Sequence, residues 1–180
     1  NAIHEYKKNK QQYELLDTHD IRVYENEILL ADALGNKVVS INYLGKCVWL
    51  YDNIKDPHSA IKNKDGIYII TDTGNNRIIM VNIEGKIVSC ITEIGGKHLN
   101  APRWIEEVGN LLLITDSGNN RIVLVDYNGN LKCSYGEQIE SDAPQLRLPR
   151  CAKKWNDELL ISDTKNNRVI KIPWQEFIKK

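Results

Sequence analysis

Two histidines and two arginines stand at matching places along this chain. Three follow a proline, in Pro57-His58-Ser59, Pro102-Arg103-Trp104 and Pro149-Arg150-Cys151, and the fourth lies in Thr18-His19-Asp20. Arginine offers a planar fork of donors that suits an anion, and histidine can give or take a proton near neutral pH. If the fold brings the four positions together, we predict an anion-binding site of His19, His58, Arg103 and Arg150. His19 and His58 are then the candidates for a catalytic base or nucleophile.

These four residues also have a purely structural interpretation. Polar side chains at the start of a strand can simply hydrogen-bond to the neighbouring element, because buried polar groups need partners. The two interpretations differ in one electrostatic consequence. Like charges gathered at one place would lower the pKa of the histidines.

A repeated phrase must supply the scaffold that positions these side chains. Asp72-Thr73-Gly74-Asn75-Asn76-Arg77 recurs closely at Asp116–Arg121 and Asp163–Arg168, and a diverged copy spans Asp32–Lys37. The intervals between the aspartates are 40, 44 and 47 residues. Such periods are typical of propeller blades or solenoid coils.

Each copy of the phrase lies between two short apolar runs that have no helical period. Ile67–Thr71 and Arg77–Val81 flank the second copy, and their β-branched residues favour neighbouring strands. The phrase is then a hairpin loop, in which Gly and Asn allow positive φ and the aspartate accepts backbone N–H groups. The basic residue five positions later returns to the carboxylate. We therefore assign a structural role in the turn to Asp32, Asp72, Arg77, Asp116, Arg121, Asp163 and Arg168.

The remaining turns complete a four-stranded unit in each repeat. The second repeat has Asp65-Gly66 and Glu84-Gly85 at its two other turns, the third has Gly109-Asn110 and Asn128-Gly129 there, and Asn-Gly and Asp-Gly are strong hairpin signals. We predict an all-β fold, a β-propeller of four-stranded antiparallel blades with about four blades in this chain. Residues 1–180 form one domain, with repeats at about 17–55, 56–100, 101–147 and 148–173 and the end of a further repeat at 1–16.

The blade number leaves three arrangements open. The blades belong to a larger, six-bladed propeller, close as a small ring, or are completed by self-association with a second chain. In the closed ring, Gln12–Leu16 would supply the outer strand that the fourth repeat lacks after Ile172. Residues Trp174–Lys180 would form a short helical tail or a poor strand.

The repeats resemble those of the NHL-repeat β-propellers. Repeats of that family open with Pro, carry a strand ending in Asp, and continue with Gly-Asn-His-Arg. Here Asn76, Asn120 and Asn167 replace the middle His. The resemblance covers about 17–172 and implies the fold, but it does not select an activity, because the family contains enzymes, protein binders and RNA binders.

A weaker resemblance connects one repeat junction to the arylsulfotransferase-type propellers. Gly45-Lys46-Cys47-Val48-Trp49 before Pro57-His58 is similar to their repeats. In that family, His and Arg at the axial mouth handle a sulfuryl group. The resemblance implies an enzyme with its site at the same mouth.

Charge and composition argue against several classes of partner. The 24 basic and 24 acidic residues cancel, which removes a bulk-charge argument for nucleic acid. No apolar run is long enough for a membrane span. We expect no cofactor and no metal: Cys47, Cys90, Cys133 and Cys151 lack zinc-ligand spacing, and the phrase aspartates are matched to basic residues instead of to calcium. The sequence assigns no compartment.

Two functions follow as hypotheses. The first is a scaffold that presents the channel mouth to a protein or small-molecule ligand, since the chain is repetitive and shows no catalytic signature. The second is a propeller enzyme, a lyase, hydrolase or sulfotransferase-like protein, that uses the His/Arg cluster.

Overall fold

The computed structural model describes residues 14–136 and 145–179. Three antiparallel sheets have four strands each, in simple sequence order. They are β1 (Thr18–Val23), β2 (Ile28–Asp32), β3 (Lys37–Ile41) and β4 (Cys47–Tyr51); β5 (Pro57–Lys62), β6 (Tyr68–Asp72), β7 (Arg77–Val81) and β8 (Ile87–Ile91); and β11 (Pro102–Val108), β12 (Leu111–Asp116), β13 (Arg121–Val125) and β14 (Leu131–Tyr135).

The fourth sheet has three strands among the described residues, β15 (Cys151–Trp155), β16 (Glu158–Asp163) and β17 (Arg168–Pro173). A small hairpin of β9 (Glu93–Ile94) and β10 (Lys97–His98) joins the second sheet to the third. The short helix α2 (Trp174–Phe177) follows β17. The predicted four-stranded meander is therefore confirmed in three repeats, and the last repeat differs by ending in a helical turn.

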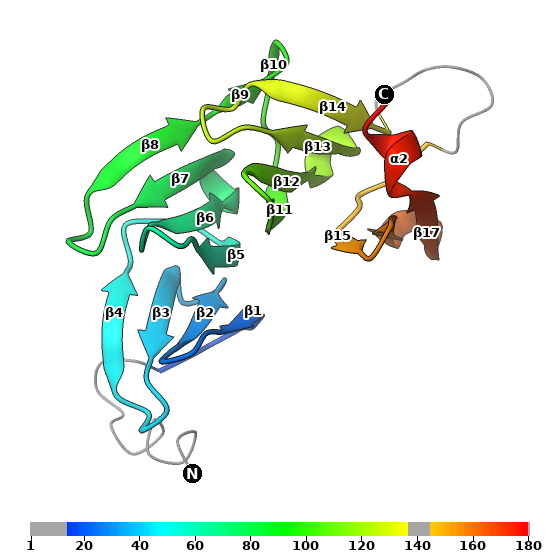
Figure 1. Ribbon diagram of the computed structural model, residues 1–180. Coiled ribbons are helices and arrows are strands. Elements are labelled where there is room, and N and C mark those ends of the chain that lie inside the picture. The colour runs from blue at the N-terminus through cyan, green and yellow to red at the C-terminus, as the bar shows by residue number, and fades with distance from the viewer. Residues whose placement is uncertain (1–13, 137–144, 180) are drawn as a thin grey trace.

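The sheets stand side by side along an arc (Figure 1). The first strand of each sheet, β1, β5, β11 or β15, lies on the inner side of the arc, and β4, β8 and β14 lie on the outer side. The first and fourth sheets stand at the two ends of the arc, apart from each other. This is the propeller arrangement that the repeats predict, with four blades.

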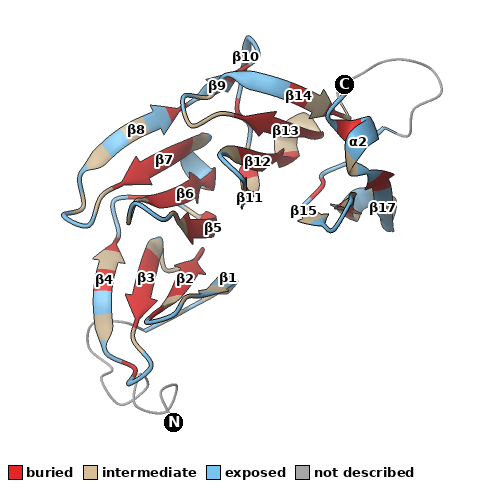
Figure 2. Ribbon diagram, viewed as in Figure 1, coloured by how far each residue is buried: buried red, intermediate tan, exposed pale blue. Residues whose placement is uncertain are grey.

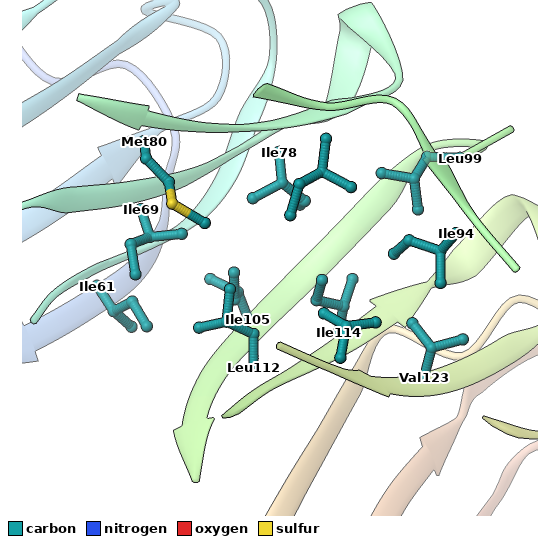
Figure 3. Close-up of a cluster of buried hydrophobic side chains, with 12 residues drawn as sticks. Ile61, Ile69, Ile78, Met80, Ile94, Leu99, Ile105, Leu112, Ile114 and Val123 are labelled. Carbon is teal, nitrogen blue, oxygen red and sulfur yellow. The ribbon is translucent and has the colours of Figure 1, made fainter. Parts of the chain in front are cut away.

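Apolar side chains pack between successive sheets and make the core. Burial is concentrated in the two middle strands of each sheet, such as β6, β7, β12 and β13 (Figure 2). Figure 3 shows the cluster between the second and third sheets, where Ile69, Ile78 and Met80 face Ile105 and Ile114. Because the middle strands of the first three sheets are buried on both faces, they read as nearly continuous apolar runs, whereas β17 in the fourth sheet is largely exposed.

The repeated phrase forms the same hydrogen-bonded loop in each sheet. The Asp72 carboxylate is fully buried, receives Arg77 Nε at 2.6 Å and Asn75 Nδ2, and accepts the N–H of Lys55 at 2.8 Å. Asp116 and Asp163 bind Arg121 and Arg168 at 2.7 Å in the same way. In the diverged copy, Lys37 Nζ lies 3.4 Å from Asp32. These contacts are the ones that the assigned turn role requires.

The second asparagine of the phrase joins one sheet to the next. Asn76 has a left-handed conformation, with φ of 54°, and its Oδ1 accepts the N–H of Ala101 at 2.8 Å in the loop that enters the third sheet. Asn36 and Asn120 accept the N–H groups of Asp56 and Leu148 in the same way. The asparagine at this position therefore tolerates the left-handed turn and also carries an inter-sheet hydrogen bond.

The described part of the N-terminal segment does not form the closing strand that a small ring would need. Residues 12 and 13 of the expected closing strand Gln12–Leu16 lie outside the described residues. Residues 14–16 are not part of a strand, and Leu15 packs against the core of the first sheet, beside Leu30 and Val39. Residues 137–144, between the third and fourth sheets, also lie outside the described residues. Among the described residues, no helix is long and apolar enough to cross a membrane.

The phrase aspartates should differ in their contribution to stability. Asp116→Ala removes the carboxylate that Arg121, whose side chain is 1% exposed, contacts at 2.7 Å, and removal of one partner of a buried ion pair costs about 3 kcal/mol or more. Asp163→Ala leaves Arg168, which is 40% exposed and keeps contact with water, so we expect a smaller loss. Urea unfolding of both variants measures the difference. Equal losses would contradict this account of Arg121.

Candidate functional site

The four predicted site residues occupy equivalent places at the start of the inner strands. In β1, Thr18 pairs with Asp32 but Asp20 pairs with Ala31, so His19 is an extra, bulged residue. The same irregularity falls at Arg103 in β11 and at His58 in β5. A β-bulge bends its strand and changes the direction of a side chain. Bulges thus turn His19, His58 and Arg103 out of the regular ladder at the start of three inner strands, whereas Arg150 directly precedes β15, whose pairing is regular.

The structure brings the four side chains together. The rings of His19 and His58 meet edge to face, with 4.4 Å between their centroids. A guanidinium nitrogen of Arg103 donates a hydrogen bond to Nε2 of His58. Arg150, at the entry to β15, is near enough for its charge to act on Arg103. We call these four residues, one from each sheet, the mouth cluster.

His58 is the buried centre of the mouth cluster. Only 7% of the residue is exposed, and Nδ1 lies 3.0 Å from the carbonyl oxygen of Asp56. Since a carbonyl can only accept, Nδ1 carries the proton and Nε2 accepts from Arg103. Burial lowers the pKa of His58, and the charges of Arg103 and His19 lower it further, although the contacts with Asp56 oppose the shift. The direction of the pKa shift is the expected one, but burial, and not the gathered charges, is its largest cause.

Arg103 and Arg150 carry charges that no carboxylate neutralises directly. Within residues 14–136 and 145–179, neither guanidinium has a carboxylate at ion-pair distance. Burial lowers the pKa of Arg103, and so does the charge of Arg150, whereas Asp56 raises it. Two cations side by side without an anion make a site that favours an anionic group.

His19 has a different environment from His58. Its Nε2 lies 2.9 Å from Oδ2 of Asp17, and 28% of its side chain is exposed. In the part of the chain that the structure describes, its Nδ1 has no hydrogen-bond partner. A histidine oriented by a carboxylate through one nitrogen, with the other nitrogen open, is arranged like a general base.

A second layer of polar side chains lies next to the mouth cluster, and the sequence analysis missed it. Arg22 donates to Asp20 at 3.0 Å and to the carbonyl oxygen of Ile105 at 3.1 Å, and its guanidinium stacks 4.2 Å from the centroid of the Trp104 ring. Ser59 donates to the same Asp20 carboxylate at 2.6 Å. The available signal was positional, since Asp20, Ser59 and Trp104 each follow a mouth residue.

Two further side chains extend this layer toward the fourth sheet. Burial raises the pKa of Glu106, against the opposing charges of Lys153 and Arg22. Burial also raises the pKa of the Cys151 thiol to about 11. A thiol with such a pKa is protonated at neutral pH and is a poor nucleophile. The four cysteines form no disulfide, and the described residues contain no cluster suited to a metal ion.

Surface cavities at the other end of the inner strands contain groups that are already paired. One cavity, of about 470 Å³, is lined by Tyr24, Glu27 and Lys62 among others. Lys62 forms an ion pair with Glu27, and Ser40 donates to the same carboxylate. A charge that is already compensated offers less to a ligand than the cations of the mouth cluster.

Comparison with solved structures agrees with the architecture. A streptogramin B lyase has a TM-score of 0.68 and 20% identity, covering 88% of this chain and 52% of that one. A catalytically inactive histidine-to-alanine variant of virginiamycin B lyase from Staphylococcus aureus, bound to quinupristin, has a TM-score of 0.66 and 22% identity, covering 91% and 56%.

A gluconolactonase from Xanthomonas campestris has a TM-score of 0.72 and 13% identity, covering 89% of this chain and 59% of that one. The fold is a β-propeller. This chain spans slightly more than half the length of these propellers. No protein-family model and no curated protein matches its sequence.

The position of His58 in the propeller predicts its titration. Because its folded pKa is lowered, the unfolded chain binds more protons just below pH 6.5, where an unperturbed histidine titrates. The contribution of neutral His58 to the free energy of unfolding is therefore fully present above about pH 6.5, and it is lost as the pH falls through the folded pKa. NMR titration should give His58 a pKa below 6.5. In His58→Gln, the free energy of unfolding should decrease less steeply than in the wild type as the pH falls below 6.5. A wild-type value at or above 6.5 would contradict the geometry described.

Proposed function

We propose that the protein is a ligand-binding β-propeller that holds an anionic group of a small molecule at the mouth cluster. The observation that supports this function best is the convergence of Arg103 and Arg150, from neighbouring blades, without a carboxylate at ion-pair distance in the described residues. Cations that repel each other cost free energy, and an anion bound between them offsets that cost.

The chemistry around the arginines favours an oxyanion, that is, a carboxylate, sulfate or phosphate group. Guanidinium groups bind such planar or tetrahedral anions with two parallel hydrogen bonds. His58 is neutral at pH 7 because its pKa is lowered, so it adds no charge of its own. The attraction for the anion comes from the two arginines.

The repeated phrase supports a relation to NHL-repeat propellers, a family that contains protein binders as well as enzymes. For this chain we favour a small-molecule ligand over a protein at the mouth cluster. Arg103 is half-buried and contacts His58, which is only 7% exposed, whereas Arg150 is exposed beside them.

Anion binding can be measured with inorganic sulfate as the probe. We expect sulfate to bind to the wild type, and Arg103→Met or Arg150→Met to weaken binding about tenfold, the effect of one charge-assisted contact worth about 1.4 kcal/mol. Lys86→Met, in the turn between β7 and β8, removes one positive charge elsewhere and is the control. Calorimetric titration at low ionic strength gives the affinities. Equal weakening by all three variants would mean that only net charge matters, and the proposed site would be wrong.

The second candidate function is an enzyme that uses His19 as its base. Asp17 and His19 have the arrangement of an orienting carboxylate and a base, and the arginines beside them can hold an anionic substrate group or a developing negative charge. Several structural neighbours are enzymes, a lyase and a gluconolactonase among them. A lyase or hydrolase reaction would begin with proton removal by Nδ1 of His19.

A substrate panel of lactones and aryl sulfates tests this second function. If the protein is such an enzyme, turnover of one of them should fall by at least about a hundredfold in His19→Ala, the usual contribution of a general base. His98→Ala, whose side chain is 83% exposed in the β9–β10 hairpin, should keep full activity. Turnover that survives in His19→Ala would exclude the residue as the base.

A further inference from the structure

The geometry points to His58 as a positioning residue, which aims the Arg103 guanidinium at the bound anion and does not itself react with the ligand. This inference rests on the proposed anion-binding function and assigns different roles to the two histidines of the mouth cluster. His19 is the histidine with a nitrogen open to a ligand, and His58 is the support behind Arg103.

Both ring nitrogens of His58 are already engaged within the protein. Nδ1 donates to the Asp56 carbonyl at 3.0 Å, and Nε2 receives Arg103. The edge-to-face contact with His19 covers part of the ring, and the residue is 7% exposed. A base or nucleophile needs a free lone pair that faces the substrate, and His58 has none while Arg103 is in place.

A neutral acceptor is well suited to hold an arginine that must bind an anion. Four other arginines, Arg22, Arg77, Arg121 and Arg168, are each held by a carboxylate, which largely cancels their charge. His58 fixes one end of the Arg103 fork through a hydrogen bond but brings no negative charge. Arg103 therefore keeps both its orientation and its attraction for an oxyanion.

The backbone fixes the histidine in turn. Asp56 has φ of 51° and its N–H is held by Asn36 of the preceding blade. Asp56 is therefore held through both of its backbone polar groups. Its N–H donates to Asn36, and its carbonyl oxygen accepts from Nδ1 of His58. The chain of contacts runs from Asn36 through Asp56 and His58 to Arg103, across three blades, and it transmits the geometry of the scaffold to one guanidinium.

Two substitutions of His58 separate positioning from direct contact. The Gln amide oxygen can accept from Arg103 in the place of Nε2, whereas Leu fills the volume without an acceptor. At pH 8, where His58 is neutral, we expect His58→Leu to weaken sulfate binding about tenfold and His58→Gln to stay within about threefold of the wild type. In the Arg103→Met background, His58→Leu should cause no further loss, because the two residues act as one unit.

His98→Leu serves as the control for loss of a histidine, since His98 is exposed. Thermal unfolding shows whether each variant is folded at the temperature of the titration. The His58 titration followed by NMR gives a readout without ligand. Because Arg103 donates to the neutral imidazole and repels the imidazolium, Arg103→Met should raise the pKa of His58.

The outcomes distinguish this inference from the proposed function. If Arg103→Met weakens sulfate binding but His58→Leu does not, or if His58→Leu weakens binding equally in both backgrounds, the positioning role is wrong and the anion site stands. If neither change affects binding, or the wild type binds no sulfate, the proposed function fails and the positioning role fails with it. An unchanged His58 pKa in Arg103→Met would by itself overturn the contact on which the inference depends.

Discussion

The buried aspartate of each repeated phrase is the constraint on which the rest of the structure depends. Its carboxylate reaches beyond its own loop and accepts a backbone N–H from the segment that enters the same blade, at Leu16, Lys55, Asn100 or Arg147. In every blade, the mouth residue stands three positions after that N–H: His19, His58, Arg103 and Arg150. The phrase therefore fixes where each inner strand begins, and with it where the four mouth side chains lie. A motif that holds the turns also builds the candidate site.

Much of this arrangement could be predicted because it is local or repeated. The periods of the phrase gave the blades, and the spacing within the phrase gave the contact between Asp72 and Arg77. Equivalence between repeats placed His19 and His58 at one mouth, because residues at the same point of successive blades must face the same axis. None of these predictions required knowing which residue, far away in the sequence, a given side chain contacts.

The rest depends on partners that no local pattern specifies. Arg22 finds its acceptors in Ser59 and the Ile105 carbonyl, which belong to two later blades. The contact from Arg103 to His58 depends on bulges in two strands that carry no special residue type. In the described part of the fourth blade, a helical turn follows β17 where the other blades have an outer strand. Phe177 of this turn packs into the core beside Tyr135 and Ile172. In that repeat, tertiary packing selected between the two alternatives that the sequence left open.

Two layers of polar side chains lie next to each other along the inner strands, one residue apart. The charges of one layer are paired with each other, and the arginines of the mouth cluster lack a carboxylate at ion-pair distance among the described residues. Asp20 and Arg22 satisfy each other, with Ser59 and the face of Trp104 filling the remaining directions. One residue earlier in the strands, Arg103 and Arg150 lack such a carboxylate in the described part of the chain. In the adjacent layer, a carboxylate of the same fold neutralises an arginine, so the fold can accommodate such a pair near its axis. Arg103 and Arg150 differ from Arg22 in this respect. The difference between the layers is therefore what an anion site requires: a rigid, compensated support behind cations whose charge is left for the ligand.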